Sequence, residues 1–363
     1  MRIAQIYHGF QRMAGTERFI LETTHEMSRR QIEVRIYTTF VDRRLFIDRH
    51  AEVETKTVGI FRMPHFFLYS NLAASKRLIE AASDWADLMI LHSGLSMAQY
   101  SWRKYNLPCV PFFHANQYDP SLFGAMRPIA GVYTFPLKAL DSKCVRSIPL
   151  AFVNSHGLYD QIRTYTEDGK LIIVPLGVDV DRFRPKWCDR GFVLMAGRLH
   201  PTNNFELGLA AAIDFPFKIV IAGIPERNSQ WYYQHLQRIV KASSKLTDRV
   251  EFLRPDEEEL IALIQNCSVF LSPRRYNYLG LAALEAMACG KPVIAYDTDD
   301  LSGSLPVMKC GDQPWKWHGA LETLMADSQL RDRIGRESQQ YIEEYHTWKK
   351  TVDTMLDATE KIT

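Results

Sequence analysis

Short apolar strands alternate with amphipathic helices along the chain, and this alternation constrains the fold more than any other feature. A strand, helix, strand order favours a parallel sheet with helices on both faces. The alternation starts again in the second half, so we predict an α/β protein with two doubly wound, Rossmann-like domains facing each other across a cleft. The predicted strands are Arg2–Tyr7, Glu33–Thr38, Asp87–Leu91, Val110–Phe113, Ala151–Asn154, Ile172–Pro175, Gly191–Ala196, Phe217–Ala222, Arg249–Leu253, Ser268–Ser272 and Pro292–Tyr296.

The 363 residues divide best at Gly177–Pro185, a segment rich in turn residues and poor in periodic apolar residues. We therefore predict an N-terminal domain of residues 1–178 and a C-terminal domain of residues 179–345, each large enough to bury its own core. A charged helix is predicted at Thr347–Ile362. We expect residues 346–363 to pack back on the first domain.

Composition excludes several classes of protein. Hydrophobic residues make up 46% and charged residues 24%, as in ordinary globular proteins, and no apolar run approaches the roughly 20 residues of a membrane span. The first residues lack the apolar core of a secretion signal, and the six cysteines include no Cys-x-x-Cys pair, so we expect a cytoplasmic protein. A net charge of +2 without basic repeats argues against a nucleic-acid partner.

Doubly wound sheets bind ligands at the carboxyl ends of their strands, so the loops after the strands are the candidates for chemistry. None of these loops carries the Gly-x-Gly-x-x-Gly of dinucleotide binding or the Gly-x-x-x-x-Gly-Lys-Ser/Thr of P-loops. This argues against dehydrogenases and P-loop enzymes. No carboxylates or histidines cluster at metal-ligand spacing, so no metal site is predicted.

Two loops contain residues suited to phosphate. After the first strand, Gly15 and Thr16 open a predicted helix, Thr16–Arg30, whose free N–H groups could hold a phosphate group. A plain glycine turn with Thr16 as the helix cap explains these residues equally well. After the strand that ends at Ala196, Arg198 stands where a guanidinium could bind phosphate through two hydrogen bonds. Taken alone, Arg198 is more simply explained as a surface arginine.

The segment after Ser272 combines a helix start with a carboxylate. Gly280 precedes a predicted helix that Gly290 ends, so the amides of Gly280 and Leu281 would point at an anion. Glu285 lies one turn further, among alanine, leucine and methionine residues. Burying an unpaired charge is costly, so Glu285 calls for a partner such as the hydroxyl groups of a sugar.

Together these segments resemble the GT-B glycosyltransferases, specifically the retaining enzymes of glycosyltransferase family 4. Residues 280–295 (GLAALEAMACGKPVIA) are similar to the signature helix of that family, and residues 175–185 (PLGVDVDRFRP) to its interdomain segment. Residues 197–199 (GRL) are similar to its phosphate loop, and residues 14–17 (AGTE) to its Gly-Gly-x-Glu turn. The resemblance runs nearly from end to end and is strongest in the second half.

The resemblance implies roles for individual residues. Glu285 would bind the ribose hydroxyls of a nucleotide-sugar donor, and Arg198 its diphosphate. His114 matches the family histidine near the transferred sugar; by itself it would be explained as a capped strand-end histidine. Gly15 would line the donor side of the first domain. The residues expected to bind the donor are Gly15, Thr16, Arg198, Asn203, Arg254, Asn277, Tyr278, Leu279, Gly280, Leu281 and Glu285. The residues expected to be catalytic are His114, Arg198 and Asn203.

Two positions depart from the family pattern. Asn277 replaces a glutamate that contacts the donor sugar, and Asn203 replaces a lysine that neutralises the leaving diphosphate. Loss of that cation could remove a few kcal/mol of transition-state stabilisation; Arg274, Arg275 or His200 could supply the charge. The changes permit an unusual donor sugar, a slow enzyme or a non-catalytic relative. We favour an active enzyme because the other site residues are present.

The implied reaction is retaining transfer of a sugar to a hydroxyl acceptor, without a metal and without a protein nucleophile. UDP-sugar is the expected donor and GDP-sugar the second choice; no further cofactor is expected. Asp179 and Asp181 form an Asp-x-Asp, but they lie in the predicted linker and are explained as turn carboxylates. A pyridoxal-phosphate phosphorylase would need a Schiff-base lysine, and Lys291 is poorly placed for one.

The acceptor pocket is expected in the N-terminal domain. The basic and aromatic stretch Phe61–Tyr69 could contact a lipid-linked acceptor or a membrane surface, although core packing explains it better. Two other functions stay open: a protein that binds sugar nucleotides without turnover, and another GT-B activity such as an epimerase or a phosphorylase. The acceptor and the oligomeric state cannot be read from the sequence.

Overall fold

The computed structural model describes residues 1–10, 14–42, 53–59, 67–92, 96–115, 130–163, 170–225, 229–275, 279–297 and 305–362, with the backbone alone for residues 67–69, 96–97 and 143–147. Contacts divide the chain into two compact units. The first unit contains Met1–Leu176 and Trp348–Thr363, and the second contains Gly177–Thr347. The division after Leu176 falls two residues before the end of the predicted first domain.

The first unit is built on a parallel sheet with the strand order β3-β2-β1-β4-β5-β6-β7. The direction in which strands are added reverses between β1 and β4, which is where a doubly wound sheet binds its ligand. The inner strands β1, β4 and β5 are almost entirely buried, as expected for the central strands of a parallel sheet. The strands are β1 (Arg2–Ile6), β2 (Glu33–Thr38), β3 (Thr55–Thr57), β4 (Leu88–Leu91), β5 (Cys109–Phe113), β6 (Ala151–Val153) and β7 (Leu171–Ile173).

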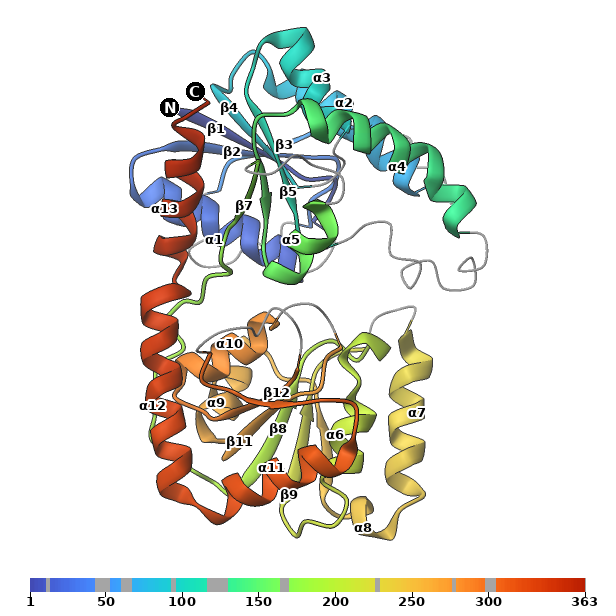
Figure 1. Ribbon diagram of the computed structural model, residues 1–363, viewed down its shortest axis with the longest axis vertical. Helices are drawn as coiled ribbons and strands as arrows, with labels where there is room; N and C mark the ends of the chain where they lie inside the picture. The colour runs from blue at the N-terminus through green and yellow to red at the C-terminus, as the bar shows by residue number, and fades with distance from the viewer. Residues whose placement is uncertain are drawn as a thin grey trace. The chain divides into compact units, whose positions relative to one another are not determined.

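Helices cover this sheet in two groups. Helix α1 packs against α13, whereas α2, α3 and α4 pack against one another in series, as Figure 1 shows. Helices on separate sides of a parallel sheet are what the predicted doubly wound fold requires. The helices of the first unit are α1 (Gly15–Arg29), α2 (Phe67–Ala82), α3 (Ser96–Tyr105), α4 (Ala130–Ser147), α5 (His156–Ile162) and α13 (Trp348–Thr359).

The second unit repeats the architecture with the strand order β10-β9-β8-β11-β12-β13, again all parallel. Its strands are β8 (Phe192–Ala196), β9 (Lys218–Ala222), β10 (Val250–Leu253), β11 (Val269–Ser272), β12 (Val293–Tyr296) and β13 (Met308–Cys310). Its helices are the 3₁₀ helix η5 (Pro201–Asn203), α6 (Phe205–Ala211), α7 (Gln230–Lys241), α8 (Ser244–Thr247), α9 (Glu257–Asn266), α10 (Leu281–Ala288), α11 (Pro314–Ala326) and α12 (Ser328–Tyr345). The predicted α/β class with two doubly wound sheets is confirmed.

The sequence pattern did not predict β3 and β13, each of which lies at one edge of its sheet. Each has three residues and pairs with one neighbour. Both contain a lysine, so neither forms a continuous apolar run, whereas the equally short edge strand β7 (sequence LII) is entirely apolar and was predicted.

The C-terminal helix α13 packs on α1 in the first unit. Trp348 begins α13 and lies edge-on to Phe19 of α1, with ring centroids 5.8 Å apart. Arg30 follows α1 and donates hydrogen bonds to Asp353 Oδ1 at 2.6 Å and to the Lys349 carbonyl at 3.0 Å. An apolar ring and a charged anchor therefore hold the last helix on the first.

We expect Arg30→Ala to lower the free energy of unfolding by about 1 kcal/mol, because it removes a charge-assisted hydrogen bond of a three-quarters-buried side chain. Urea unfolding measures the effect. Arg29→Ala is the matched control: the Arg29 side chain is 68% exposed, lies 3.7 Å from Glu26, and should change stability by no more than about 0.5 kcal/mol. Equal losses in the two variants would show that Arg30 does not anchor α13.

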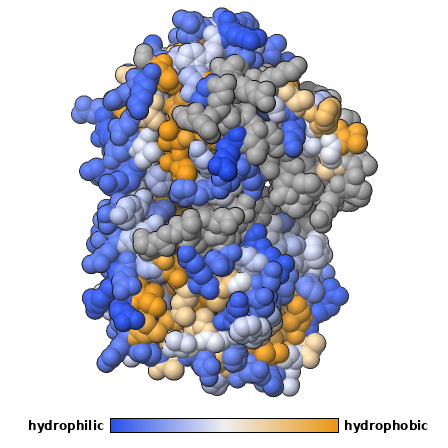
Figure 2. Space-filling view, viewed as in Figure 1, coloured by the Kyte–Doolittle hydropathy of each residue, from blue (hydrophilic) through white to orange (hydrophobic). Residues whose placement is uncertain are grey.

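The surface is mostly polar on the face shown in Figure 2, with apolar residues in separate patches. Among the described residues, exposed large apolar side chains include Val132 and Phe135 of α4 and Trp231 of α7. None of the described helices is long and apolar enough to cross a membrane. The predicted membrane-contact stretch Phe61–Tyr69 lies outside the residues whose side chains the structure describes.

Candidate functional site

Arg198 lies on a loop at the carboxyl edge of the second sheet, where the end of the neighbouring strand β9 and the residues after it hold the loop. The Gly197 amide donates to the Ala222 carbonyl at 3.0 Å, and the Leu199 amide donates to the Ile224 carbonyl at 3.1 Å. A Cβ atom at Gly223 would lie 1.9 Å from the Gly197 carbonyl oxygen, so only glycine fits there. The loop that carries the exposed Arg198 is therefore fixed by backbone contacts with the loop after β9.

Asn203 contacts this loop directly. Its amide nitrogen Nδ2 donates to the Arg198 carbonyl at 2.6 Å, and its side chain is buried. The next residue, Asn204, donates from Nδ2 to the Pro273 carbonyl at 3.2 Å in the loop after β11. These two amides tie the Arg198 loop to the loop that leads into α10. Asn203 thus shapes the backbone at Arg198, and its side chain supplies no charge.

Helix α10 begins at the same edge of the sheet. Gly280 is its N-cap residue, and the first amides of a helix have no partner within that helix. A Cβ atom at Gly280 would lie 3.2 Å from Nη1 of Arg274, so the Arg274 guanidinium stands beside the start of the helix. The positive end of the helix dipole and a guanidinium therefore coincide, which suits an anion.

Glu285 is 3% exposed in the middle of α10. The helix ends at Gly290, whose φ of +69° places it in the left-handed region that favours glycine. The amides of Gly290 and Lys291 close the end by donating to the Met287 and Ala286 carbonyls, both at 2.9 Å. This closure fixes the register of α10 and so the place of Glu285.

Other cations proposed as replacements for the missing lysine have different roles. Arg275 forms an ion pair with Asp312 at 2.7 Å on the exposed surface. His200 is the N-cap of η5 and accepts at Nδ1 from the Thr202 amide at 3.3 Å. Lys291, which was considered only as a Schiff-base lysine, is buried and donates to the Cys188 carbonyl at 2.6 Å. Of the predicted replacements, Arg274 is the one that stands at the start of α10.

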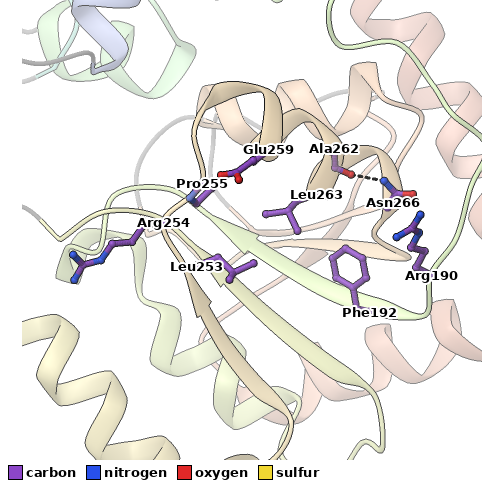
Figure 3. A pocket seen from close by; sticks show the side chains of 9 residues that line it. All are labelled: Arg190, Phe192, Leu253, Arg254, Pro255, Glu259, Ala262, Leu263 and Asn266. Atoms are coloured by element: carbon purple, nitrogen blue, oxygen red, sulfur yellow. Dashed lines mark hydrogen bonds between the residues drawn. The ribbon is translucent and has the colours of Figure 1, made fainter.

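A cavity of about 400 Å³ lies beside α9, and Figure 3 shows the side chains that line it. Phe192, Leu253 and Leu263 form its apolar wall. Arg254 belongs to its rim, but its guanidinium points away from the cavity and lies over the Tyr233 ring, 5.5 Å from the centroid. Of the predicted donor-binding residues, this cavity contains Arg254 alone.

In the first unit, Gly15 and Thr16 are the first two residues of α1. The N-cap is Ala14, which makes no side-chain cap hydrogen bond, so the alternative in which Thr16 caps the helix is wrong. A Cβ atom at Gly15 would meet no described atom within 4 Å. No described atom therefore crowds the Gly15 position, and its role toward a ligand stays a prediction.

His114 follows β5 directly and is half-buried among aromatic rings. Its ring stacks on Phe112 with centroids 4.5 Å apart and meets Phe19 edge-on at 5.0 Å. Its Nε2 lies 2.9 Å from Nδ1 of the buried His92, and its carbonyl accepts from Asn154 Nδ2 at 3.1 Å. Burial lowers the pKa of His114 to about 3, so its imidazole is neutral at ordinary pH.

We expect acid to destabilise the protein through these histidines. Burial holds the pKa of His92 well below its usual value near 6.5, with the His114 charge adding to the effect. Below pH 6.5 the unfolded chain therefore binds protons that the folded chain does not, so the free energy of unfolding falls as the pH is lowered. Urea unfolding between pH 7.5 and pH 5 should show a shallower loss for His92→Gln, by up to about 1.4 kcal/mol per pH unit. The same slope in both proteins would contradict a neutral, buried His92.

Asn277 and Tyr278 lie outside the described residues. Leu279 is buried directly before Gly280. The carboxylates of the Asp-x-Asp are engaged locally: Asp179 Oδ1 accepts from the Asp181 amide at 3.1 Å, and Asp181 pairs with Arg184 at 3.3 Å. Among the described residues, no three histidine, cysteine or acidic side chains are grouped as metal ligands would be.

Sequence reasoning missed His92 and Gln5, which form a hydrogen-bonded chain with His114. Gln5 Oε1 lies 2.7 Å from His92 Nε2, and Gln5 is fully buried within β1. A signal for His92 existed, because it follows the strand β4 just as His114 follows β5. Nothing in the sequence marks Gln5, which interrupts an apolar strand and is explained only by its partners.

Two family models together match most of the chain. The family model "Glycosyltransferase Family 4" matches residues 13–182, and the model "Glycosyl transferases group 1" matches residues 179–341. D-inositol 3-phosphate glycosyltransferase of Salinispora tropica is 29% identical over 234 residues, which are 54% of this chain and 48% of that protein. The match thus spans about half of that relative. The enzyme of the same name from Mycobacterium leprae is 25% identical over 375 residues, 94% of this chain and 87% of that protein.

Solved structures agree in fold over the whole chain. Anabaena HepE in complex with UDP and glucose superposes with a TM-score of 0.80, 14% identity and 99% coverage of both chains. Sucrose-phosphate synthase from Thermosynechococcus elongatus gives a TM-score of 0.81 and 16% identity, with 99% of this chain and 98% of that chain covered. Two family matches that together span residues 13–341 and a shared fold show that the protein belongs to the GT-B glycosyltransferases of glycosyltransferase family 4.

Proposed function

We propose that this protein is a retaining hexosyltransferase that moves a sugar from a nucleotide-diphosphate sugar to a hydroxyl acceptor, without a metal ion. The observation that carries the proposal is the convergence of the Arg198 loop and the start of α10 at one edge of the second sheet, joined by the Asn204–Pro273 hydrogen bond. Phosphate binding at a helix start and at a guanidinium follows from elementary electrostatics.

The donor is assigned to the second unit. Arg198 and the amides at the start of α10 would bind the diphosphate, and Arg274 would provide the charge that the family lysine provides elsewhere. Positive groups fixed in place before the reaction stabilise the charge that develops on the leaving diphosphate. Glu285 would accept hydrogen bonds from the ribose hydroxyls. UDP-sugar is the proposed donor: HepE, which shares the fold, was solved with UDP and glucose.

The acceptor is assigned to the first unit, where Gly15 begins α1 and His114 directly follows β5. The reaction would proceed on one face of the sugar, with the leaving phosphate accepting the proton of the attacking hydroxyl group. Neutral His114 would hydrogen-bond a sugar hydroxyl without taking a charge. The relatives from Salinispora tropica and Mycobacterium leprae bear the name D-inositol 3-phosphate glycosyltransferase.

Two features support a reaction without a metal ion: the Asp-x-Asp carboxylates have local partners, and arginines can supply the positive charge. Asp179 and Asp181 bind their own turn and Arg184, while Arg198 and Arg274 would supply positive charge at the proposed diphosphate site.

We also propose that the protein is cytoplasmic. The five cysteines whose side chains are described are free thiols, which suits a reducing compartment.

A second function, binding of sugar nucleotides without turnover, is favoured by one observation. Asn203 uses its amide on the Arg198 carbonyl and brings no charge to the place where the family has lysine. Such a protein would bind UDP and release nothing from the donor.

Release of the nucleotide from UDP-, GDP- and ADP-sugars, with and without EDTA, separates these functions. We expect UDP release from a UDP-sugar that EDTA does not reduce. Tight UDP binding without release, even with a cell extract as the acceptor source, would favour the binding protein. No binding of any nucleotide would overturn the assignment of Arg198 and α10 to the donor.

A further inference from the structure

Gln5, His92 and His114 form one hydrogen-bonded chain across neighbouring strands of the first unit. Gln5 lies in β1, His92 directly follows β4, and His114 directly follows β5; these three strands are neighbours in the sheet. The His114 Nε2 to His92 Nδ1 distance is 2.9 Å, and the His92 Nε2 to Gln5 Oε1 distance is 2.7 Å. The proton positions on the two imidazoles and the orientation of the amide therefore depend on one another.

Contacts with helix α1 fix the orientation of the Gln5 side-chain amide. Gln5 Nε2 lies 2.6 Å from the Thr24 hydroxyl and 3.3 Å from the Ile20 carbonyl. It also lies 3.3 Å from the Thr23 oxygen, whose own hydroxyl proton is donated to the Phe19 carbonyl at 2.8 Å. A carbonyl and an already donating hydroxyl both require a donor. The Gln5 nitrogen must face α1, so its oxygen faces His92.

The orientation of Gln5 sets the proton positions of both histidines. An oxygen at Gln5 accepts, so His92 Nε2 carries a proton and donates it. His92 is 4% exposed, and burial keeps the ring neutral, so the ring has one proton and Nδ1 accepts. His114 must then donate from Nε2. In a neutral imidazole with Nε2–H, Nδ1 holds a lone pair and no proton.

We propose that Gln5 and His92 are positioning residues that hold His114 as the Nε2–H tautomer, so that His114 Nδ1 accepts a hydrogen bond from a sugar hydroxyl. This role rests on the proposed function. None of the described residues hydrogen-bonds His114 Nδ1, while Phe112 and Phe19 fix the ring plane. An atom that can only accept attracts a hydroxyl group and repels the oxygens of a phosphate. The ligand class at His114 is therefore a hydroxyl-bearing sugar rather than an anion.

The tautomer can be measured without any substrate. In the full-length protein labelled with ¹⁵N-histidine, long-range ¹H–¹⁵N correlation spectra at pH 7.5 distinguish protonated from unprotonated ring nitrogens. We expect protonated Nε2 and unprotonated Nδ1 for both residues, each assigned by the pattern lost in His114→Asn and in His92→Gln. A proton on Nδ1 of His114, or signals averaged between two tautomers, would overturn the proposal.

A matched pair of variants tests the positioning role. His92→Gln keeps a donor toward Gln5 and an acceptor toward His114, whereas His92→Phe keeps only the aromatic contacts. We expect His92→Phe to average the His114 tautomers and to lower UDP release from the donor about tenfold, and His92→Gln to restore both. The Kd for UDP should be the same in both variants. A fixed His114 tautomer in His92→Phe, or equal losses in the two variants, would contradict positioning.

The outcomes separate this inference from the proposed function. If the wild-type protein binds no nucleotide, the donor assignment fails, and the tautomer spectrum still decides the arrangement of His114. If UDP binds and the donor is turned over but His114 carries its proton on Nδ1, the inference fails and the proposed function stands.

Discussion

Glu285→Gln is expected to weaken UDP binding about a hundredfold. The substitution keeps the shape of a side chain that is 3% exposed within α10, but it replaces a charged acceptor by a neutral amide. Hydrogen bonds to a charged group contribute about 1.5–3 kcal/mol each, so the loss of charge at two ribose hydroxyls gives an effect of this size. Isothermal titration with UDP measures it.

The ligand itself provides the sharpest control for Glu285. A UDP analogue that lacks both ribose hydroxyls should bind the wild-type protein and Glu285→Gln with equal, weak affinity, because the interaction is then absent in both. Glu322→Gln, an exposed carboxylate on α11, should leave UDP binding unchanged. If Glu285→Gln weakened binding of the analogue as much as binding of UDP, Glu285 would stabilise α10 rather than bind the ribose hydroxyls.

Gly335→Ala is expected to lower the free energy of unfolding by about 3 kcal/mol. Gly335 lies inside α12, where a Cβ atom would come 2.1 Å from the Gly290 carbonyl oxygen at the end of α10. Both partners are backbone, so no side chain can turn away, and one helix must shift. Because Gly290 closes the helix that carries Glu285, we expect weaker UDP binding as well. Urea unfolding and titration with UDP measure the two effects.

Gly319→Ala is the matched control, because Gly319 also lies inside a helix of the second unit. A Cβ atom there would meet nothing within 4 Å. Alanine favours a helix by about 0.8–1 kcal/mol over glycine, so this variant should be more stable than the wild type. Opposite signs for two glycine-to-alanine changes would show that the contact between α12 and the end of α10 needs glycine. Equal and small effects would show that it does not.

Much of the architecture could be predicted from local patterns. Most of the buried strands are rich in apolar residues, and the predicted strand ends agree with the structure to within one or two residues, as at Glu33–Thr38. Some helix starts could also be predicted: Gly280 precedes α10 as expected. These features depend on neighbours in sequence, so the sequence contains the signal.

The contacts within the site depend on partners far apart in the chain. Asn203 was predicted to face the donor because it stands at the position of the family lysine, and its bond to the Arg198 carbonyl could not be foreseen from that position. The pairing of Gln5 with His92 joins residues 87 positions apart. Arg274 was one of three candidate cations, and only the fold distinguishes it from Arg275, which pairs with Asp312. No local pattern encodes such pairings.

The anomeric configuration of the sugar first released tests the central proposal most directly. UDP-α-glucose is incubated with the protein in EDTA, and the ¹H NMR spectrum is followed from the first minutes, before the free sugar equilibrates. Retaining, metal-independent chemistry predicts UDP release with the α-anomer of glucose appearing first. The β-anomer appearing first, or release that requires a divalent metal, would contradict it.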